Sequence, residues 1–281
     1  MNILVSGGAG FIGSHLVKKL SESHVVTVID RKTGFNILTD DLYTLFEYGK
    51  FNVVFHLAAN SDISTGDPAI EYADTFKTTM ALLGVCRQYK VMEFIFASSS
   101  AVYGDSFYSL NETSPYKPIS HYGAAKMASE AFIYSYARRF NIKSWICRFP
   151  NVVGSNATHG VIFDLLRKNK LNPERLEVLG NGHQLKPYIH VSELIDAILY
   201  VWTSSRAWVN DYNIAPKGFT TVREIAEMIT DNEIVYTGES WPGDCQKYEF
   251  DTHKLSRLGW NPRMTSTEAV KLAIDELKKE L

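Results

Sequence analysis

Tyr122 and Lys126 are the residues of this chain whose types and spacing first indicate chemistry. On a helix, side chains four positions apart project from the same face, so a phenol and an ammonium group would lie together. A free phenol with a pKa near ~10 is a poor base at neutral pH, but a neighbouring positive charge stabilises its phenolate form. The spacing therefore predicts that Tyr122 acts as a base with Lys126 beside it.

A glycine-rich turn near the N-terminus indicates which group that base would face. Gly7, Gly10 and Gly13 follow a short apolar run and precede a segment with helical spacing, which is the context that a dinucleotide-binding loop requires. Glycines let the backbone approach a pyrophosphate, and the helix N-terminus supplies amide donors. Asp30 ends the next apolar run, where a carboxylate accepts hydrogen bonds from the adenosine ribose. Although Arg31 could pair with a 2′-phosphate, we expect it at the solvated surface, and we expect NAD rather than NADP. The cationic nicotinamide would further favour a phenolate.

Alternating apolar segments predict the elements that must hold these residues. Short, continuously apolar runs indicate strands, and segments with a 3.6-residue period indicate helices. The expected strands are 3–5, 25–29, 52–58, 93–97 and 143–149, and the expected helices between them are 14–21, 68–89 and 122–140. This alternation predicts an α/β protein with a Rossmann-type doubly wound parallel sheet, in which residues 1–150 form the NAD-binding domain.

The second half of the chain has shorter elements and more turns. Helical periodicity is present near 191–203, 221–230 and 267–281. We expect residues 151–281 to form a smaller C-terminal α/β lobe that binds the substrate, with some segments returning to the first domain. Ser98–Ser100 end a predicted strand, so they should point into the crevice at the carboxyl ends of the strands.

Composition excludes several classes of protein. The chain has 281 residues, of which 45% are hydrophobic and 21% charged, and its net charge is −2. These values are typical of a globular protein and give no general attraction for nucleic acid. No apolar run approaches the roughly 18 residues that span a bilayer, and the N-terminus lacks the features of a signal peptide. Three widely spaced cysteines indicate reduced thiols. We therefore expect a cytoplasmic protein that binds neither membrane nor nucleic acid, and no metal site.

Several motifs in order resemble the extended short-chain dehydrogenase/reductases, in particular the NAD-dependent nucleotide-sugar epimerase/dehydratase family of the UDP-glucose 4-epimerase type. The segments that carry the resemblance are 6–13 (SGGAGFIG), 56–59 (HLAA), 98–104 (SSSAVYG), 122–126 (YGAAK), 148–154 (RFPNVVG), 188–191 (YIHV) and 258–260 (LGW). They cover nearly the whole chain. The order of the motifs is specific for the family and much less specific for the substrate.

The resemblance implies roles for individual residues. The catalytic residues would be Ser99, Tyr122 and Lys126, where Ser99 hydrogen-bonds the reacting sugar oxygen and Lys126 also binds the nicotinamide ribose. The residues expected at NAD are Gly7, Gly10, Phe11, Ile12, Gly13, Asp30, Asn36, Ile37, Leu57, Ala58, Ala59, Ser98, Tyr122 and Lys126. The residues expected at a nucleotide-diphosphate sugar are Ser99, Ser100, Tyr122, Asn151, Gln184 and Lys186. The family also implies a homodimer formed by the helices near 68–89 and 122–140.

The chain departs from the family pattern at positions that carry information. Dehydratases of the family place Asp-Glu after the catalytic hydroxyl residue, because elimination of water needs a further acid and base. Here Ser100 and Ala101 occupy those positions, which argues against 4,6-elimination. Trp241 stands where many relatives have an arginine that reaches the diphosphate, and Thr75 replaces a familiar asparagine. The segment between Asp30 and Asn52 is also short.

These observations predict an NAD-dependent nucleotide-sugar 4-epimerase that acts through a transient 4-keto sugar, with UDP-glucose and UDP-galactose or their N-acetyl analogues as the default substrates. Two alternatives remain within the family: a 4-ketoreductase or dehydrogenase that exchanges its cofactor, and an epimerase at another carbon. A catalytically inactive NAD-binding regulator is the alternative from a different class.

Overall fold

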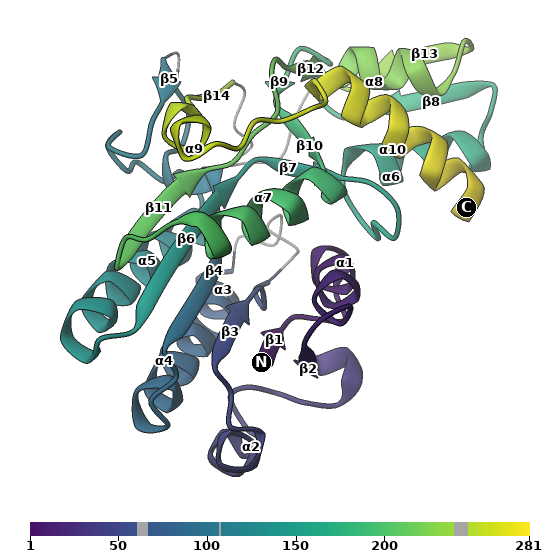
Figure 1. The fold of residues 1–281 in the computed structure, drawn as a ribbon. Coiled ribbons are helices and arrows are strands. Elements are labelled where there is room, and N and C mark those ends of the chain that lie inside the picture. The colour runs from purple at the N-terminus through teal and green to yellow at the C-terminus, as the bar shows by residue number, and fades with distance from the viewer. Residues whose placement is uncertain (61–66, 107, 239–246) are drawn as a thin grey trace. The chain divides into compact units, whose positions relative to one another are not determined.

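The computed structural model describes residues 1–60, 67–106, 108–238 and 247–281 (Figure 1). The chain divides into two compact units, each built from separate segments. The first unit contains Met1–Gly104, Pro115–Arg148 and Ile198–Tyr212. The second unit contains Asp105–Ser114, Phe149–Ala197 and Asn213–Leu281.

The first unit alternates strands with helices. Its elements are β1 (Asn2–Ser6), α1 (Phe11–Leu20), β2 (Val25–Ile29), η1 (Arg31–Thr33), α2 (Leu42–Gly49), β3 (Val53–His56), α3 (Pro68–Glu71), η3 (Tyr72–Lys77), α4 (Thr78–Gln88), β4 (Glu93–Ser99), η4 (Ser100–Val102), α5 (His121–Phe140), β6 (Lys143–Phe149) and β11 (Val209–Asn213). The last residues of β6 and β11 belong to the second unit.

A six-stranded sheet forms the centre of the first unit, in the order β11-β6-β4-β3-β1-β2 (Figure 1). β1 pairs in parallel with β2 and with β3, and β3 pairs in parallel with β4. Ser6 lies opposite both Ile29 and His56, so the carboxyl ends of three strands are level. The chain moves to opposite sides of β1, which creates the switch point where doubly wound sheets bind ligands. The predicted Rossmann-type sheet is thus confirmed.

Both faces of this sheet are covered by side chains from helices. One face packs against a core cluster that includes Phe46 of α2, Leu82 of α4 and Ile133 of α5. On the other face, the ring of Phe55 meets the ring of Trp202 at a centroid distance of 5.3 Å. Coverage on both faces explains why the strands are continuously apolar rather than alternating.

The helix that the sequence predicts over 68–89 is interrupted by a π-helical segment, η3. Threonine hydroxyls bond back to main-chain carbonyls at this point: Thr78 Oγ1 donates to Asp74 O at 2.8 Å, and Thr79 Oγ1 donates to Thr75 O at 2.8 Å. Such bonds compete with the regular helical pattern. Hydrophobic periodicity reports only the spacing of apolar side chains and not these hydroxyl bonds. The sequence therefore predicted one regular helix.

The second unit contains short paired strands and several helices. Its elements are β5 (Ser109–Leu110), β7 (Asn151–Val153), α6 (Val161–Leu171), β8 (Arg175–Val178), β9 (Leu185–Lys186), β10 (Tyr188–His190), β12 (Thr220–Thr221), α8 (Val222–Ile229), β13 (Glu233–Tyr236), β14 (Glu249–Phe250), α9 (His253–Leu258) and α10 (Ser266–Glu280), with α7 (Val191–Ser204) running on into the first unit. β7 pairs with β10, β8 with β13, β9 with β12 and β5 with β14.

Capping boxes fix where two helices of the second unit begin. Thr221 caps α8 and Thr265 caps α10, each with a glutamate three residues later that bonds back to the cap. This reciprocal arrangement satisfies amide groups that a helix start otherwise leaves unpaired. Across the described ranges of both units, the helices are too short or too polar to cross a bilayer.

Candidate functional site

The turn between β1 and α1 leaves no room for side chains at two of the three glycines expected at NAD. Gly7 has a φ of +74°, and a Cβ there would lie 2.7 Å from the amide nitrogen of Ala58. A Cβ on Gly13 would lie 2.0 Å from the carbonyl oxygen of Gly7. Gly10 is the N-cap of α1, and no side chain caps that helix. The backbone amides of the first turn are therefore available to an anion, which fits a pyrophosphate.

Asp30 follows β2 and lies beside this loop. Its Oδ2 accepts a hydrogen bond from Ala9 N at 3.1 Å, and its Oδ1 accepts one from Lys32 N at 2.9 Å. A carboxylate has about four lone-pair positions, so both oxygens can also accept from a ribose. Arg31, expected to be simply solvated, forms an exposed ion pair with Asp74 at 2.6 Å. This pairing competes with any phosphate for the guanidinium group.

The other residues expected at the cofactor lie around the same edge of the sheet. Leu57 N donates to Ser6 O at 3.0 Å, which holds the segment after β3 against the end of β1. Asn36 directs its side-chain oxygen to Leu38 N at 3.0 Å, and Ile37 is buried. The remaining residues of this group are half-buried: Phe11, Ile12, Leu57, Ala58 and Ala59.

The structure brings Ser99, Tyr122 and Lys126 together. Ser120 caps α5 by accepting from Gly123 N at 3.1 Å, which places Tyr122 in the first turn of the helix. The Ser99 hydroxyl lies close enough to the Tyr122 phenol to favour its ionised form. Lys126 lies one turn further along and is buried, with its Nζ 5.6 Å from the centroid of the Tyr122 ring. The expected proximity of the three side chains is therefore present.

Burial acts in opposite directions on the two titratable groups. Burial raises the pKa of Tyr122 to about 12, although the hydrogen bond with Ser99 opposes the shift and the negative charge of Glu71 adds to it. Burial lowers the pKa of Lys126 to about 8, while Glu71 and Glu130 raise it. At neutral pH the pair is thus a neutral phenol beside an ammonium group, and a further positive charge is needed before Tyr122 can act as a base.

Two buried carboxylates near these residues were not singled out from the sequence. Glu71 accepts from Asn60 Nδ2 at 2.8 Å and from Thr75 Oγ1 at 3.1 Å. Glu130 accepts a short hydrogen bond from Ser98, whose hydroxyl is therefore directed at α5. The position of Glu130, four residues after Lys126, was the available signal, because it places a third polar group on the same face of α5.

The candidate substrate residues of the second unit differ in exposure. Asn151 is exposed at the start of β7, and Lys186 in β9 is half-buried. Gln184 is buried, and its Oε1 has no hydrogen-bond partner in the part of the chain that the structure describes. Trp241 lies outside the described residues. His190 is bonded to Ser192 Oγ at 2.8 Å and to Glu276 Oε2 at 3.1 Å.

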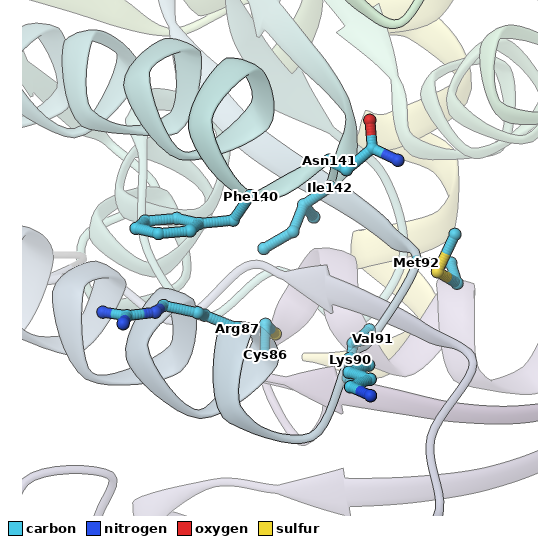
Figure 2. Close-up of a pocket in the computed structure, with 8 residues that line it drawn as sticks. All are labelled: Cys86, Arg87, Lys90, Val91, Met92, Phe140, Asn141 and Ile142. Carbon is cyan, nitrogen blue, oxygen red and sulfur yellow. The ribbon is translucent and has the colours of Figure 1, made fainter.

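A cavity of about 290 Å³ lies away from all of these residues. Figure 2 shows that its lining comes from the ends of α4 and α5 and from the turns that lead into β4 and β6. It is therefore at the amino ends of the strands, whereas Ser99 is at a carboxyl end. Cys86 lines this cavity, and burial raises the pKa of its thiol. Within the described ranges, no three His, Cys, Asp or Glu side chains lie close enough together to hold a metal ion.

The family model and the similar proteins all point to the same family. The model of the NAD dependent epimerase/dehydratase family matches residues 3–215. A putative UDP-glucose 4-epimerase of Methanocaldococcus jannaschii is 30% identical, and the match covers 98% of each protein. A solved structure of a UDP-galactose 4-epimerase is 37% identical with a TM-score of 0.89, and covers 100% of both chains. A UDP-glucuronic acid 4-epimerase from Bacillus cereus, in complex with UDP-glucuronic acid and NAD, is 26% identical with a TM-score of 0.90 and the same coverage.

Proposed function

Because the chain belongs to the NAD dependent epimerase/dehydratase family, whose cofactor is NAD, we propose that it is a 4-epimerase of UDP-sugars. UDP-glucose and UDP-galactose, or their N-acetyl analogues, are the proposed substrates. The observation that carries the proposal is the gathering of Ser99, Tyr122 and Lys126, with Lys126 Nζ 5.6 Å from the centroid of the Tyr122 ring. These groups lie at the same edge of the sheet as the glycine loop.

The first unit supplies the residues that would hold NAD. Gly7 and Gly13 provide the close backbone turn, and the N-terminus of α1, which no side chain caps, would supply amide donors to the pyrophosphate. Asp30 receives the adenosine ribose, and a 2′-phosphate there would meet a carboxylate, which favours NAD over NADP. The chemistry that bound NAD supplies is reversible hydride transfer at the sugar carbon.

The chain's own residues would handle the proton and the orientation of the sugar. Tyr122 takes the proton of the sugar 4-hydroxyl, and Ser99 hydrogen-bonds the same oxygen. The Lys126 ammonium stabilises the phenolate and binds the nicotinamide ribose. Inversion requires the resulting 4-keto sugar to present its opposite face before Tyr122 returns the proton. The same groups thus serve both directions of the reaction, as an epimerase requires.

The residues after Ser99 support epimerisation over 4,6-elimination. Ser100 and Ala101 form the 3₁₀ turn η4, and Ala101 N donates to Ser99 Oγ at 3.2 Å. Neither residue has a carboxyl group, so the acid and base that elimination needs are lacking at these two positions. A reaction that needs one proton-transfer group, Tyr122, fits this loop better.

In the first unit, Ser99, Ser100 and Tyr122 are the candidates for contact with the sugar nucleotide, and the second unit contributes candidates of its own. These are Asn151, Gln184 and Lys186. The unpartnered Oε1 of buried Gln184 supports a ligand contact at this residue, because buried polar atoms normally find a partner.

The proposal extends to a cytoplasmic homodimer. The free, buried thiols of Cys86 and Cys147 agree with a reducing compartment.

The first experiment is incubation of the purified protein, without added cofactor, with UDP-, dTDP-, GDP- and ADP-sugars, followed by chromatography with mass detection. We expect a new product of unchanged mass from UDP-glucose or its N-acetyl analogue, because the cofactor should stay bound through the cycle. A product lighter by one water would instead make the protein a dehydratase. Turnover that needs stoichiometric reduced cofactor would make it a reductase, and bound NAD without any turnover would indicate a regulator.

A further inference from the structure

Helix α5 meets the end of strand β4 at three points. Two are hydrogen bonds, from Lys126 Nζ to Ala97 O at 2.7 Å and from Ser98 Oγ to Glu130 Oε1, and the third is the proximity of the Ser99 hydroxyl to Tyr122. The three helix residues are spaced by four, and the three strand residues are consecutive. The separation between the proposed base and its partner hydroxyl is therefore set by how β4 is held against α5.

The carboxylate of Glu130 is itself held firmly. Arg148 Nε donates to both of its oxygens, at 3.0 and 3.1 Å, and Nη2 donates to Oε2 at 2.8 Å. Tyr116 also donates to Oε2, at 3.1 Å. Arg148 in turn donates to Asp211 on β11 at 2.8 Å and to Tyr103 at 2.7 Å. Ser98 is therefore bonded to a group that two strands and a loop keep in place.

The other two attachments are less suited to hold the strand during a reaction. The hydroxyls of Tyr122 and Ser99 both bond the reacting oxygen in the proposed mechanism, so the contact between them changes with each proton transfer. Lys126 has the nicotinamide ribose as a second partner. The bond from Ser98 to Glu130 involves neither the sugar nor the cofactor, and the charge of Glu130 is already balanced by buried Arg148.

We propose that Ser98 and Glu130 are positioning residues, which hold the end of β4 so that the Ser99 hydroxyl stays in register with Tyr122. This inference rests on the proposed function. It gives Ser98 a task different from that of Ser99: Ser98 acts through its neighbour and does not touch the sugar. Since misplacement of a reacting group by about 1 Å can cost up to ~10²-fold in rate, a single buried hydrogen bond is sufficient to matter.

The test is a double-mutant cycle of Ser98→Ala and Ser99→Ala, because Ser98→Ala leaves the Glu130–Arg148 ion pair intact. Turnover of the UDP-sugar identified by the panel is measured at saturating substrate, together with KM, bound NAD and thermal unfolding. Ser129→Ala is the matched control. Ser129 is a buried serine like Ser98, but it lies on α5 and donates within its own helix, to Ala125 O at 2.9 Å. We expect Ser98→Ala to lower kcat about tenfold with KM nearly unchanged.

The informative result is the effect of Ser98→Ala in the Ser99→Ala background. If Ser98 acts through Ser99, the second substitution lowers kcat by less than about twofold there. An equal tenfold loss in both backgrounds, or a loss of the same size from Ser129→Ala, would overturn the positioning role while leaving the proposed function intact. Wild-type protein that turns over none of the sugars would instead overturn the proposed function, and this inference with it.

Discussion

At the level of single residues, the site joins a phenol that is hard to ionise with an ammonium group that is easily neutralised. Burial raises the pKa of Tyr122 to about 12 and lowers that of Lys126 to about 8. With a pKa of about 12, Tyr122 alone would not act as a base at neutral pH. In the proposed mechanism the positive nicotinamide ring of oxidised NAD would supply the missing charge, which would link proton abstraction to the presence of the oxidised cofactor.

Replacement of Tyr122 by Phe tests this role. We expect Tyr122→Phe to lower kcat by about 10²–10⁴-fold, because no other group at this position can take the proton, while NAD remains bound through the glycine loop and Asp30. Turnover and the NAD released on denaturation are measured. Tyr43→Phe, at an exposed tyrosine of α2, is the control and should behave as wild type. Wild-type turnover in Tyr122→Phe would remove this tyrosine from the mechanism.

The sequence predicts some of these residues better than others, for a physical reason. Tyr122 and Lys126 are neighbours on one helix, so their spacing alone brings them together. The contacts of Ser98 with Glu130 and of Arg31 with Asp74 join different elements, and their geometry depends on how the chain folds. Partners of this kind become visible only when the packing is known.

Among the elements, the strands could be predicted closely because they are buried on both faces and continuously apolar. The segment 68–89 shows the limit of periodicity. The apolar spacing is helical throughout, but the structure has a π-helical segment at Tyr72–Lys77, beside which the hydroxyls of Thr78 and Thr79 bond to backbone carbonyls. β11 could not be predicted for a different reason. Its sequence, Val-Asn-Asp-Tyr-Asn, is polar, and Asp211 is buried there through its ion pair with Arg148.

His56 ties three elements of the first unit and predicts a pH dependence of stability. Ser6 of β1 bonds its Nδ1 at 2.7 Å, and Thr79 of α4 bonds its Nε2 at 2.9 Å. Burial, assisted by the charge of Lys126, lowers its pKa from 6.5 to about 3. As the pH falls below 6.5 the unfolded chain takes up the proton first, so the stability that neutral His56 contributes is present above pH 6.5 and is lost on acidification.

We therefore expect His56→Gln to lose less stability than wild type between pH 7.5 and pH 5. The difference should be about 2 kcal/mol, because pH 5 lies roughly 1.5 units below the unfolded pKa and each unit is worth about 1.4 kcal/mol. Urea unfolding at the two pH values measures it. His253→Gln, at an exposed histidine, is the matched control and should keep the wild-type pH dependence. An unchanged pH dependence in His56→Gln would mean that His56 is protonated in the folded protein.

For the whole molecule, the sequence predicts the Rossmann-type sheet from alternating strands and helices. We expected some segments after residue 150 to return to the first domain, but which segments each unit contains follows only from long-range pairing. The first unit includes Ile198–Tyr212, which comes later in the sequence than its other segments. The second unit includes Asp105–Ser114, which lies between two segments of the first unit in the sequence. The candidate residues follow this division, with Ser99, Tyr122 and Lys126 in the first unit and Gln184 and Lys186 in the second.

A surface of the first unit supports the proposed homodimer. The ring of Phe76 lies 5.9 Å from that of Tyr72 and 5.4 Å from that of Phe132, which joins η3 to α5 through aromatic contacts. Tyr72 is 56% exposed and Phe132 is 43% exposed. Large exposed aromatic side chains that cluster are typical of interfaces, and here they lie on the two helical segments for which the family implies self-association.

We expect light scattering at micromolar concentration to give about twice the monomer mass of 31.7 kDa. Phe132→Glu should shift the protein to the monomer with its circular dichroism unchanged, because a carboxylate at an apolar interface loses hydration without gaining a partner. Tyr48→Glu is the control, since Tyr48 is an aromatic residue of α2 that is 78% exposed and lies outside the cluster. A monomeric wild type would reject the dimer, and a Phe132→Glu protein that stays dimeric would place the interface on another surface.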